Sequence, residues 1–208
     1  HVRGARSTPS TVEIWMAAGV IFLLLALSIR FEFYTLEISK LVYFIFGAMY
    51  ISTLFIIAGI DKEKRYIPKS VLLFGIITAT IYMIYLYVVE KANIYRYVIY
   101  LALLCILLAV DTFLLKKKGK NYYWLQVLTL VIYTILFTGE YVFVVTCLFF
   151  LLCIPITIFI HKITSKRAKY VKTDKQVMQD FRFGFYFCTI NLIVWIVTNF
   201  YITYICGG

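Results

Sequence analysis

The feature that most constrains the fold is a series of about seven apolar runs, each near the length that an α-helix needs to cross a bilayer. They cover roughly residues 13–29, 40–60, 70–89, 95–115, 122–137, 141–160 and 184–206. Only helices and closed barrels satisfy the backbone in lipid, and a barrel would read as short segments of alternating polarity. With 63% hydrophobic and 15% charged residues, the chain is predicted to be an all-α, polytopic membrane helical bundle with about seven transmembrane helices.

The charge balance is strongly basic, with 21 Lys and Arg against 10 Asp and Glu. Such an excess could indicate either a nucleic acid or an anionic membrane surface as the partner. The charges stand in short clusters between the apolar runs, where headgroups would lie. We therefore expect the lipid bilayer as a partner and no nucleic acid.

The basic clusters also predict an orientation, because short cytoplasmic loops collect Lys and Arg. Loops on one side hold 17 of these residues, and loops on the other side hold 4. The larger set consists of Arg3, Arg6, Lys62, Lys64, Arg65, Lys69, Lys116, Lys117, Lys118, Lys120 and seven residues between positions 162 and 182. We expect the N-terminus to be cytosolic and the C-terminus to be outside.

Domain organisation is predicted to be simple. Residues 1–10 lack an initiator methionine and are interpreted as a remnant added during cloning, and residues 11–208 as a single transmembrane helical domain. Thr138, Gly139 and Glu140 alone separate the fifth and sixth runs, which predicts a tight helical hairpin. No cofactor and no metal site are expected, because the five cysteines are scattered with no histidine nearby.

Two carboxylates are candidates for chemistry, because ionisable residues at membrane depth are costly and mark function. Asp61 closes the second run, and Asp111 lies about one turn inside the end of the fourth run, on the same predicted side. Glu140 belongs to the opposite side and could not meet either of them.

The stretch that begins at Asp61 reads DKEKRYIPKSVLLFG and resembles the first catalytic motif of the type IV prepilin peptidases. That motif has an aspartate, three residues, a basic residue, then Ile-Pro and Asn or Asp, followed by an apolar helix. The matching positions are Asp61, Arg65, Ile67, Pro68 and Gly75, and Lys69 stands at the Asn or Asp position.

Two later segments are similar in layout to other parts of the same family, so that the resemblance covers roughly residues 33–206. Residues 116–120 are similar to its second motif region, and Arg182-Phe183-Gly184-Phe185-Tyr186 resembles a Pro-Phe-Gly-Pro segment. The family is an aspartic protease of the Gly-x-Gly-Asp type, but the place of its second aspartate here reads GKNYYW, without an acid. Tyr122, Tyr123 and Trp124 in this stretch are interpreted as an interfacial anchor.

The resemblance implies a membrane-embedded aspartic endopeptidase of the prokaryotic plasma membrane, serving type IV pilus assembly or secretion. It would cleave leader peptides of pilin-like, single-helix substrates at the cytosolic face. Hydrolysis by this route needs two carboxylates that share a proton, so that one activates water while the other donates to the carbonyl oxygen. Asp61 would be one of them and Asp111 is the only depth-matched second, with Arg65, Ile67, Pro68 and Lys69 as substrate-binding or motif residues.

Other interpretations remain open. The missing aspartate suggests an inactive pseudoprotease that serves as a scaffold or binder of membrane helices, and a subunit of a small-molecule transporter is a further alternative. Asp61 could pair with Arg65, and Asp111 with Lys116. Pro68 could simply start a helix. Gln126 and Asn191 are predicted to be interhelical hydrogen-bond partners rather than site residues.

Overall fold

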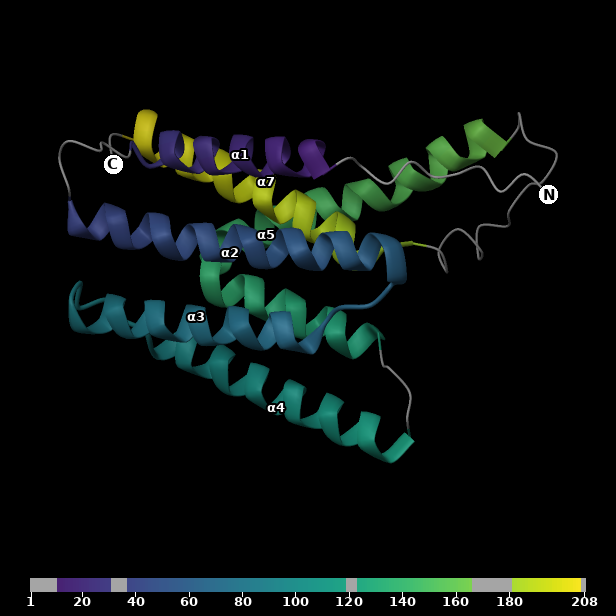
Figure 1. Ribbon diagram of the computed structural model, residues 1–208, viewed down its shortest axis with the longest axis horizontal. Coiled ribbons are helices and arrows are strands. Elements are labelled where there is room, and N and C mark those ends of the chain that lie inside the picture. Colours follow the sequence, from purple (N-terminus) through teal and green to yellow (C-terminus); the bar gives the residue numbers. More distant parts are fainter. Residues whose placement is uncertain (1–10, 31–36, 119–122, 166–180, 207–208) are drawn as a thin grey trace. The chain divides into compact units, whose positions relative to one another are not determined.

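A computed structural model describes residues 11–30, 37–118, 123–165 and 181–206. Within these ranges the chain is all-helical, which confirms the predicted class (Figure 1). The helices are α1 (Thr11–Ser28), α2 (Ile38–Lys64), α3 (Lys69–Val88), α4 (Tyr95–Lys118), α5 (Tyr123–Ser165) and α7 (Phe183–Tyr204). Several parts of the sequence analysis fall outside the described residues. They are residues 1–10, the start near residue 33 of the region that the resemblance covers, the GKNY stretch at 119–122, and most of the basic loop before α7.

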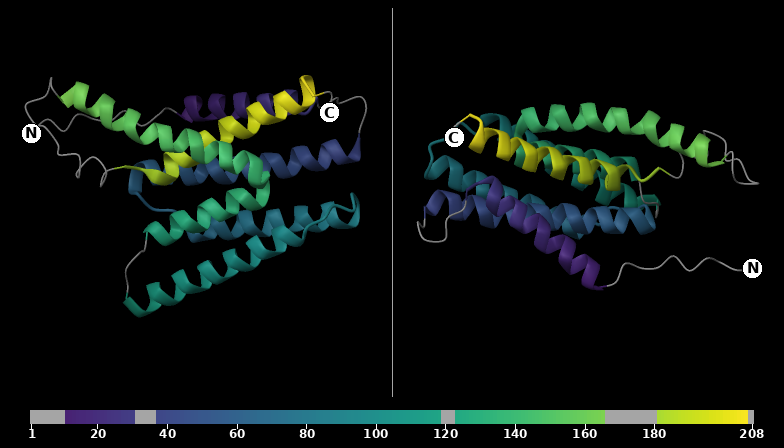
Figure 2. Two further views of the ribbon diagram at one scale, coloured as in Figure 1. Left: turned by 180° about the vertical axis from the view of Figure 1, so that it is seen from behind. Right: turned by 90° about the horizontal axis from the view of Figure 1, so that it is seen from above.

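Helix α5 reverses direction within its own length, as the left view of Figure 2 shows. The reversal occurs at Gly139, whose φ of 81° and ψ of 171° lie in a region that is essentially restricted to glycine. We call residues 123–138 the first arm and residues 140–165 the second arm. The predicted tight hairpin at Thr138–Gly139–Glu140 is therefore present, and it joins the two arms of α5.

Five of the described helices are long and apolar enough to cross a membrane. They are Ile38–Lys64, Lys69–Val88, Tyr95–Leu114, Tyr123–Thr157 and Phe183–Tyr204, while Gly19–Ser28 is a shorter apolar helix. The difference from about seven predicted segments has a physical cause. Two predicted segments are the arms of α5, which count as one helix, and the described apolar part of α1 is too short to be counted.

The chain divides into two compact units. The first comprises His1–Ala48 and Ile196–Gly208, and in its described part the end of α7 is tied to the end of α1. The Tyr204 hydroxyl donates to the Leu27 carbonyl at 3.0 Å, and the Arg30 guanidinium lies 4.6 Å above the Tyr204 ring. Between α2 and α7, the Tyr43 hydroxyl donates to Asn199 Oδ1 at 3.1 Å.

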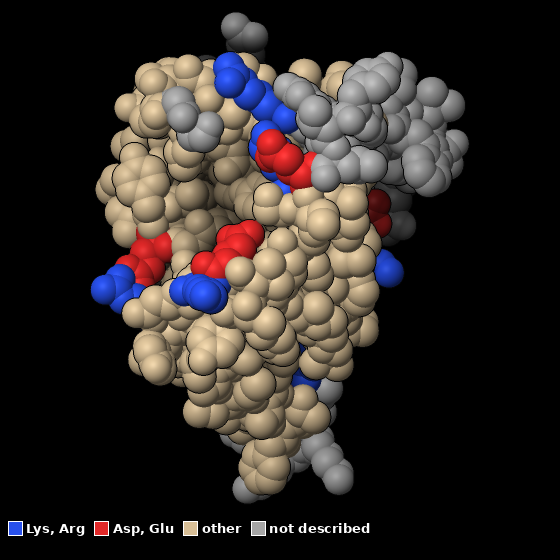
Figure 3. All heavy atoms as spheres, turned by 90° about the vertical axis from the view of Figure 1, so that its left-hand side faces the viewer, with Lys and Arg blue, Asp and Glu red and all other residues tan. Residues whose placement is uncertain are grey.

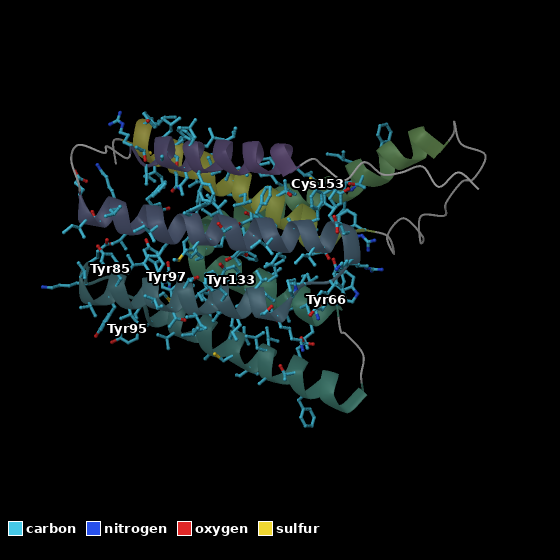
Figure 4. All side chains as sticks on the ribbon, in the orientation of Figure 1. Tyr66, Tyr85, Tyr95, Tyr97, Tyr133 and Cys153 are labelled. Atoms are coloured by element: carbon cyan, nitrogen blue, oxygen red, sulfur yellow. The ribbon has the colours of Figure 1, made fainter. Side chains whose placement is uncertain are left out.

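The second unit, Met49–Trp195, holds the larger core and both candidate carboxylates. Within it, α3 and α4 pack against α5 and against each other. Gly75 permits the close approach of α3 to the first arm, because a Cβ there would lie 2.7 Å from Tyr133 Cζ. Tyr133 lies in the middle of the bundle in Figure 4, and it is fully buried. The glycine of the motif thus has a packing role.

A polar connection crosses the apolar interior of the second unit. The Tyr50 hydroxyl of α2 donates to Asn191 Oδ1 of α7 at 2.5 Å, and Asn191 Nδ2 donates to Thr146 Oγ1 in the second arm of α5 at 3.2 Å. Asn191 and Thr146 are fully buried. The Tyr50 ring stacks on Phe137 at 4.1 Å and meets the edge of Trp195. The prediction that Asn191 joins helices is confirmed.

Candidate functional site

The site begins where α2 ends. Arg65 has a φ of 51°, and its backbone N–H donates to the Asp61 carbonyl at 3.0 Å, which closes the last turn in the left-handed conformation. The chain then runs to Pro68, whose extended backbone (φ −71°, ψ 123°) directly precedes Lys69 at the start of α3. The motif residues from Asp61 to Lys69 therefore span the end of α2, the turn at residues 65–68 and the first residue of α3. Pro68 is the residue directly before α3, close to the helix-starting role that the sequence left open. Figure 4 places Tyr66 at this turn. We call this end of the second unit the Asp61 end.

The Asp61 carboxylate is fully buried and lies at the N-terminus of α7. Its Oδ2 atom accepts a hydrogen bond from the Phe185 backbone N–H at 2.9 Å and one from the Tyr123 hydroxyl at 3.2 Å. The Tyr123 oxygen in turn accepts from the Gly184 backbone N–H at 3.3 Å. The first N–H groups of a helix lack partners within the helix and carry a partial positive charge, which makes them a suitable site for a carboxylate. Asp61 thus caps α7 from a different part of the chain.

Gly184 makes this contact sterically possible. A Cβ at that position would lie 3.1 Å from Asp61 Oδ2 and 3.3 Å from Ile67 Cδ1, closer than ordinary van der Waals contact. The glycine of the Arg182–Tyr186 segment therefore allows α7 to approach the end of α2. Three segments singled out by the resemblance, around Asp61, around Tyr123 and around Gly184, meet at one place.

Residues of the first arm of α5 complete the site. The Arg65 guanidinium lies 5.1 Å above the Tyr123 ring, and no ion pair joins Arg65 to Asp61 among the described side chains. One turn after Tyr123, Gln126 Oε1 accepts a hydrogen bond from the Ile67 backbone N–H at 3.3 Å. Gln126 was predicted to join two helices, but its partner is the backbone of the turn between α2 and α3. Tyr123 and Gln126 bind the turn between α2 and α3 from the side.

Asp111 has a separate partner. It is 2% exposed, and its Oδ2 atom lies 2.8 Å from Lys69 Nζ, so that the ion pair joins the start of α3 to α4. The alternative partner Lys116 has a side chain outside the described set. No hydrogen bond between Asp61 and Asp111 occurs among the described side chains, although each retains one buried oxygen, Oδ1, without a partner there.

Glu140 lies at the other end of the second unit, as the sequence indicated. It accepts hydrogen bonds from the Arg96 guanidinium at 3.3 Å and from the Tyr100 hydroxyl at 2.9 Å, both near the start of α4. Figure 4 labels Tyr95 and Tyr97 at the same end. We call this the Glu140 end. These contacts are exposed, and they lie at the opposite end of the second unit from Asp61.

The structure brings together Asp61, Arg65 and Ile67 from the predicted set and keeps Asp111 with Lys69. Sequence reasoning missed Tyr123 as the partner of Asp61, having interpreted it as part of an interfacial anchor. Trp124, 64% exposed, fits that anchor, whereas Tyr123 points inward to Asp61. The sequence did contain one signal for this role of Tyr123. The residue stands at the start of a helix, where the resembling peptidase family has its second aspartate.

The chemistry of the site is that of a buried carboxyl group held by hydrogen-bond donors. Within the described ranges, no three His, Cys, Asp or Glu side chains gather closely enough to hold a metal ion. Comparisons of the chain with protein-family models, with curated proteins and with solved structures found no match.

Proposed function

We propose that this chain is a membrane protein that binds a single apolar helix, of the kind found in pilin-like proteins, without hydrolysing it. The observation that carries the proposal is the hydrogen bond from the Tyr123 hydroxyl to Asp61. In a two-carboxylate mechanism the group that faces the first aspartate must exchange a proton with it and with water. A phenol in that place remains protonated at neutral pH and cannot act as the second, proton-exchanging acid.

The partners of both aspartates support the same proposal. Asp61 Oδ2 is occupied by the Phe185 N–H and by Tyr123, and Asp111 Oδ2 is occupied by Lys69. These contacts use the Asp61 side chain to cap the start of α7 and the Asp111 side chain to pair α4 with α3, which suits a structural role. The convergence of the three resembling segments on Asp61 supports descent from a peptidase-like arrangement, with the helix-binding role retained.

A second candidate function is the aspartic endopeptidase itself, acting in type IV pilus assembly or secretion, with Asp61 and Asp111 as the two acids. The observation in its favour is that both carboxylates are buried near the ends of α2 and α4, each with an oxygen that has no partner among the described side chains. It requires Asp111 to leave Lys69 when substrate binds. It also requires the predicted orientation, with the Asp61 end in the cytosol of a prokaryotic cell.

One experiment separates the two candidates. The purified chain, in lipid nanodiscs, is mixed with a synthetic substrate that has a short basic leader followed by an apolar helix. We expect the substrate to co-purify intact with the wild-type protein. Cleavage by the wild type that disappears in both Asp61→Asn and Asp111→Asn would establish the peptidase instead. Absence of both binding and cleavage would overturn both candidates.

A gain-of-function variant adds a positive test of the site. Tyr123→Asp places an acid on the helix face that already meets Asp61. Cleavage that appears in Tyr123→Asp and is lost in the double variant with Asp61→Asn would support a degenerate peptidase site. Tyr123→Phe is the matched control, because it removes the hydroxyl without adding an acid.

A further inference from the structure

The two ends of the second unit differ in charge. At the Asp61 end the described side chains include five cations, Lys62, Lys64, Arg65, Lys69 and Arg182, and three carboxylates, Asp61, Glu63 and Asp111. At the Glu140 end there are two of each, Lys91 and Arg96 with Glu90 and Glu140. Figure 3 faces the latter end, where basic and acidic side chains stand next to each other among uncharged ones. Among the described side chains of this unit, the Asp61 end alone has a positive excess.

The buried acids at the Asp61 end leave most of these cations without a close carboxylate. Asp111 is paired with Lys69, and Asp61 is enclosed by Phe185 and Tyr123, with Arg182 near enough to attract its charge. The described ion pairs include no partner for Lys62 or Arg65. A cation at the boundary of a membrane protein is most favourably neutralised by an anionic lipid.

Two of these cations are held in place by aromatic rings. The Lys62 ammonium lies 5.3 Å above the Phe185 ring, and the Arg65 guanidinium lies 5.1 Å above the Tyr123 ring. Lys62 is on the last turn of α2 and Arg65 directly follows that helix, and both rings belong to residues that donate a hydrogen bond to Asp61 Oδ2. Cation–π contacts restrict the long side chains and lower the conformational entropy lost when a ligand binds.

Arg65 also occupies a position that favours glycine. Its φ of 51° is in the left-handed region, which is unfavourable for a residue with a Cβ. Its Nε atom is buried without a hydrogen-bond partner among the described side chains. Such strain and an unused donor at one residue are features of binding sites. The guanidinium geometry matches the oxygens of a phosphate.

We propose that the Asp61 end binds the headgroup of an anionic phospholipid through Lys62, Arg65 and Arg182. The headgroup phosphate takes the free guanidinium and ammonium donors, and the exposed Trp124, 64% accessible, lies at the headgroup level beside it. The acyl chains lie along the apolar outer faces of the membrane-spanning helices. This inference concerns the lipid around the protein and does not depend on whether the site binds or cleaves a peptide helix.

Native mass spectrometry of the detergent-solubilised protein tests the proposal, with phosphatidylglycerol and phosphatidylcholine added in separate titrations. We expect retained phosphatidylglycerol adducts for the wild type. Lys62→Gln, Arg65→Gln and Arg182→Gln should each weaken binding about fivefold, the effect of one charge near an anionic lipid surface. Tyr123→Leu, which removes the ring under Arg65, should also weaken binding.

The Glu140 end supplies the matched control. Lys91→Gln and Arg96→Gln remove the same charge from positions with a similar place at a helix boundary, and they should leave phosphatidylglycerol binding unchanged. An equal loss in these variants would overturn the proposal, as would equal retention of phosphatidylcholine. Displacement of the lipid by inorganic phosphate at matched ionic strength would also overturn it, since the site would then recognise phosphate alone. Circular dichroism of each variant checks that the helices are intact.

Discussion

Asp61 Oδ2 lies 2.9 Å from the backbone nitrogen of Phe185, although 124 positions separate the two residues in the chain. The contact joins the last part of α2 to the first turn of α7. It uses the orphan N–H groups of a helix start and a carboxylate that would be expensive to bury alone. The hydrogen bonds between them replace those that each group would make with water, and they hold the Asp61 side chain in one position.

Removal of the Asp61 carboxylate should destabilise the second unit. Asp61→Ala leaves the Phe185 N–H and the Tyr123 hydroxyl without an acceptor, at a cost of about 1–3 kcal/mol for each buried donor. Asp61→Asn should cost less, because the carboxamide oxygen can still accept from Phe185. Thermal unfolding in detergent measures the difference, and equal midpoints for Ala and Asn would contradict the capping role.

Gly184→Ala should be destabilising for a steric reason. The new methyl group would lie 3.1 Å from Asp61 Oδ2 and force the capping carboxylate to move. Gly59→Ala is the matched control, because that exposed helical glycine has no atom within 4 Å of the new Cβ, and alanine is the better helix former. We expect a lower unfolding midpoint for Gly184→Ala only; a loss of similar size in Gly59→Ala would point to a general effect of methyl groups.

The Lys69–Asp111 ion pair should be more sensitive to the loss of one partner than to the loss of both. Lys69→Met leaves the Asp111 carboxylate, 2% exposed, without its cation, and the expected cost is about 3 kcal/mol. The double variant Lys69→Met with Asp111→Leu removes both charges and should recover most of that loss. A denaturant titration of the three proteins checks this. If the double variant is no more stable than Lys69→Met, the pair is not coupled.

Asn191→Leu should weaken the connection between α2, α5 and α7. It removes the hydrogen bonds to Tyr50 and Thr146, and interhelical bonds of this type in membranes are worth about 0.6–2 kcal/mol. Thr189→Val serves as a control on the same helix, because its hydroxyl bonds only to the Phe185 carbonyl within α7. The unfolding midpoint should fall for Asn191→Leu and remain close to that of the wild type for Thr189→Val.

The helical class and the approximate positions of the helices follow from the sequence alone. Lipid allows the backbone few solutions, so runs of about 20 apolar residues leave little choice other than helices. The reversal at Gly139 could also be predicted from the sequence, because three residues that include a glycine between two apolar runs permit only a tight turn. The same is true of Asn191, because a buried amide in an apolar helix must find a partner on another helix. The orientation across the membrane stays a prediction.

Only the tertiary structure decided which groups meet. Asp61 bonds to Phe185 and Tyr123, Arg65 lies on Tyr123, and Asp111 pairs with Lys69. The spacing along the chain had only offered Arg65 as an alternative partner for Asp61 and Lys116 for Asp111. The physical reason is that local spacing fixes which residues share a helix face, whereas the neighbour opposite that face depends on how the helices pack. Gly75 and Gly184 set that packing by close contact, which no periodicity in the sequence reveals.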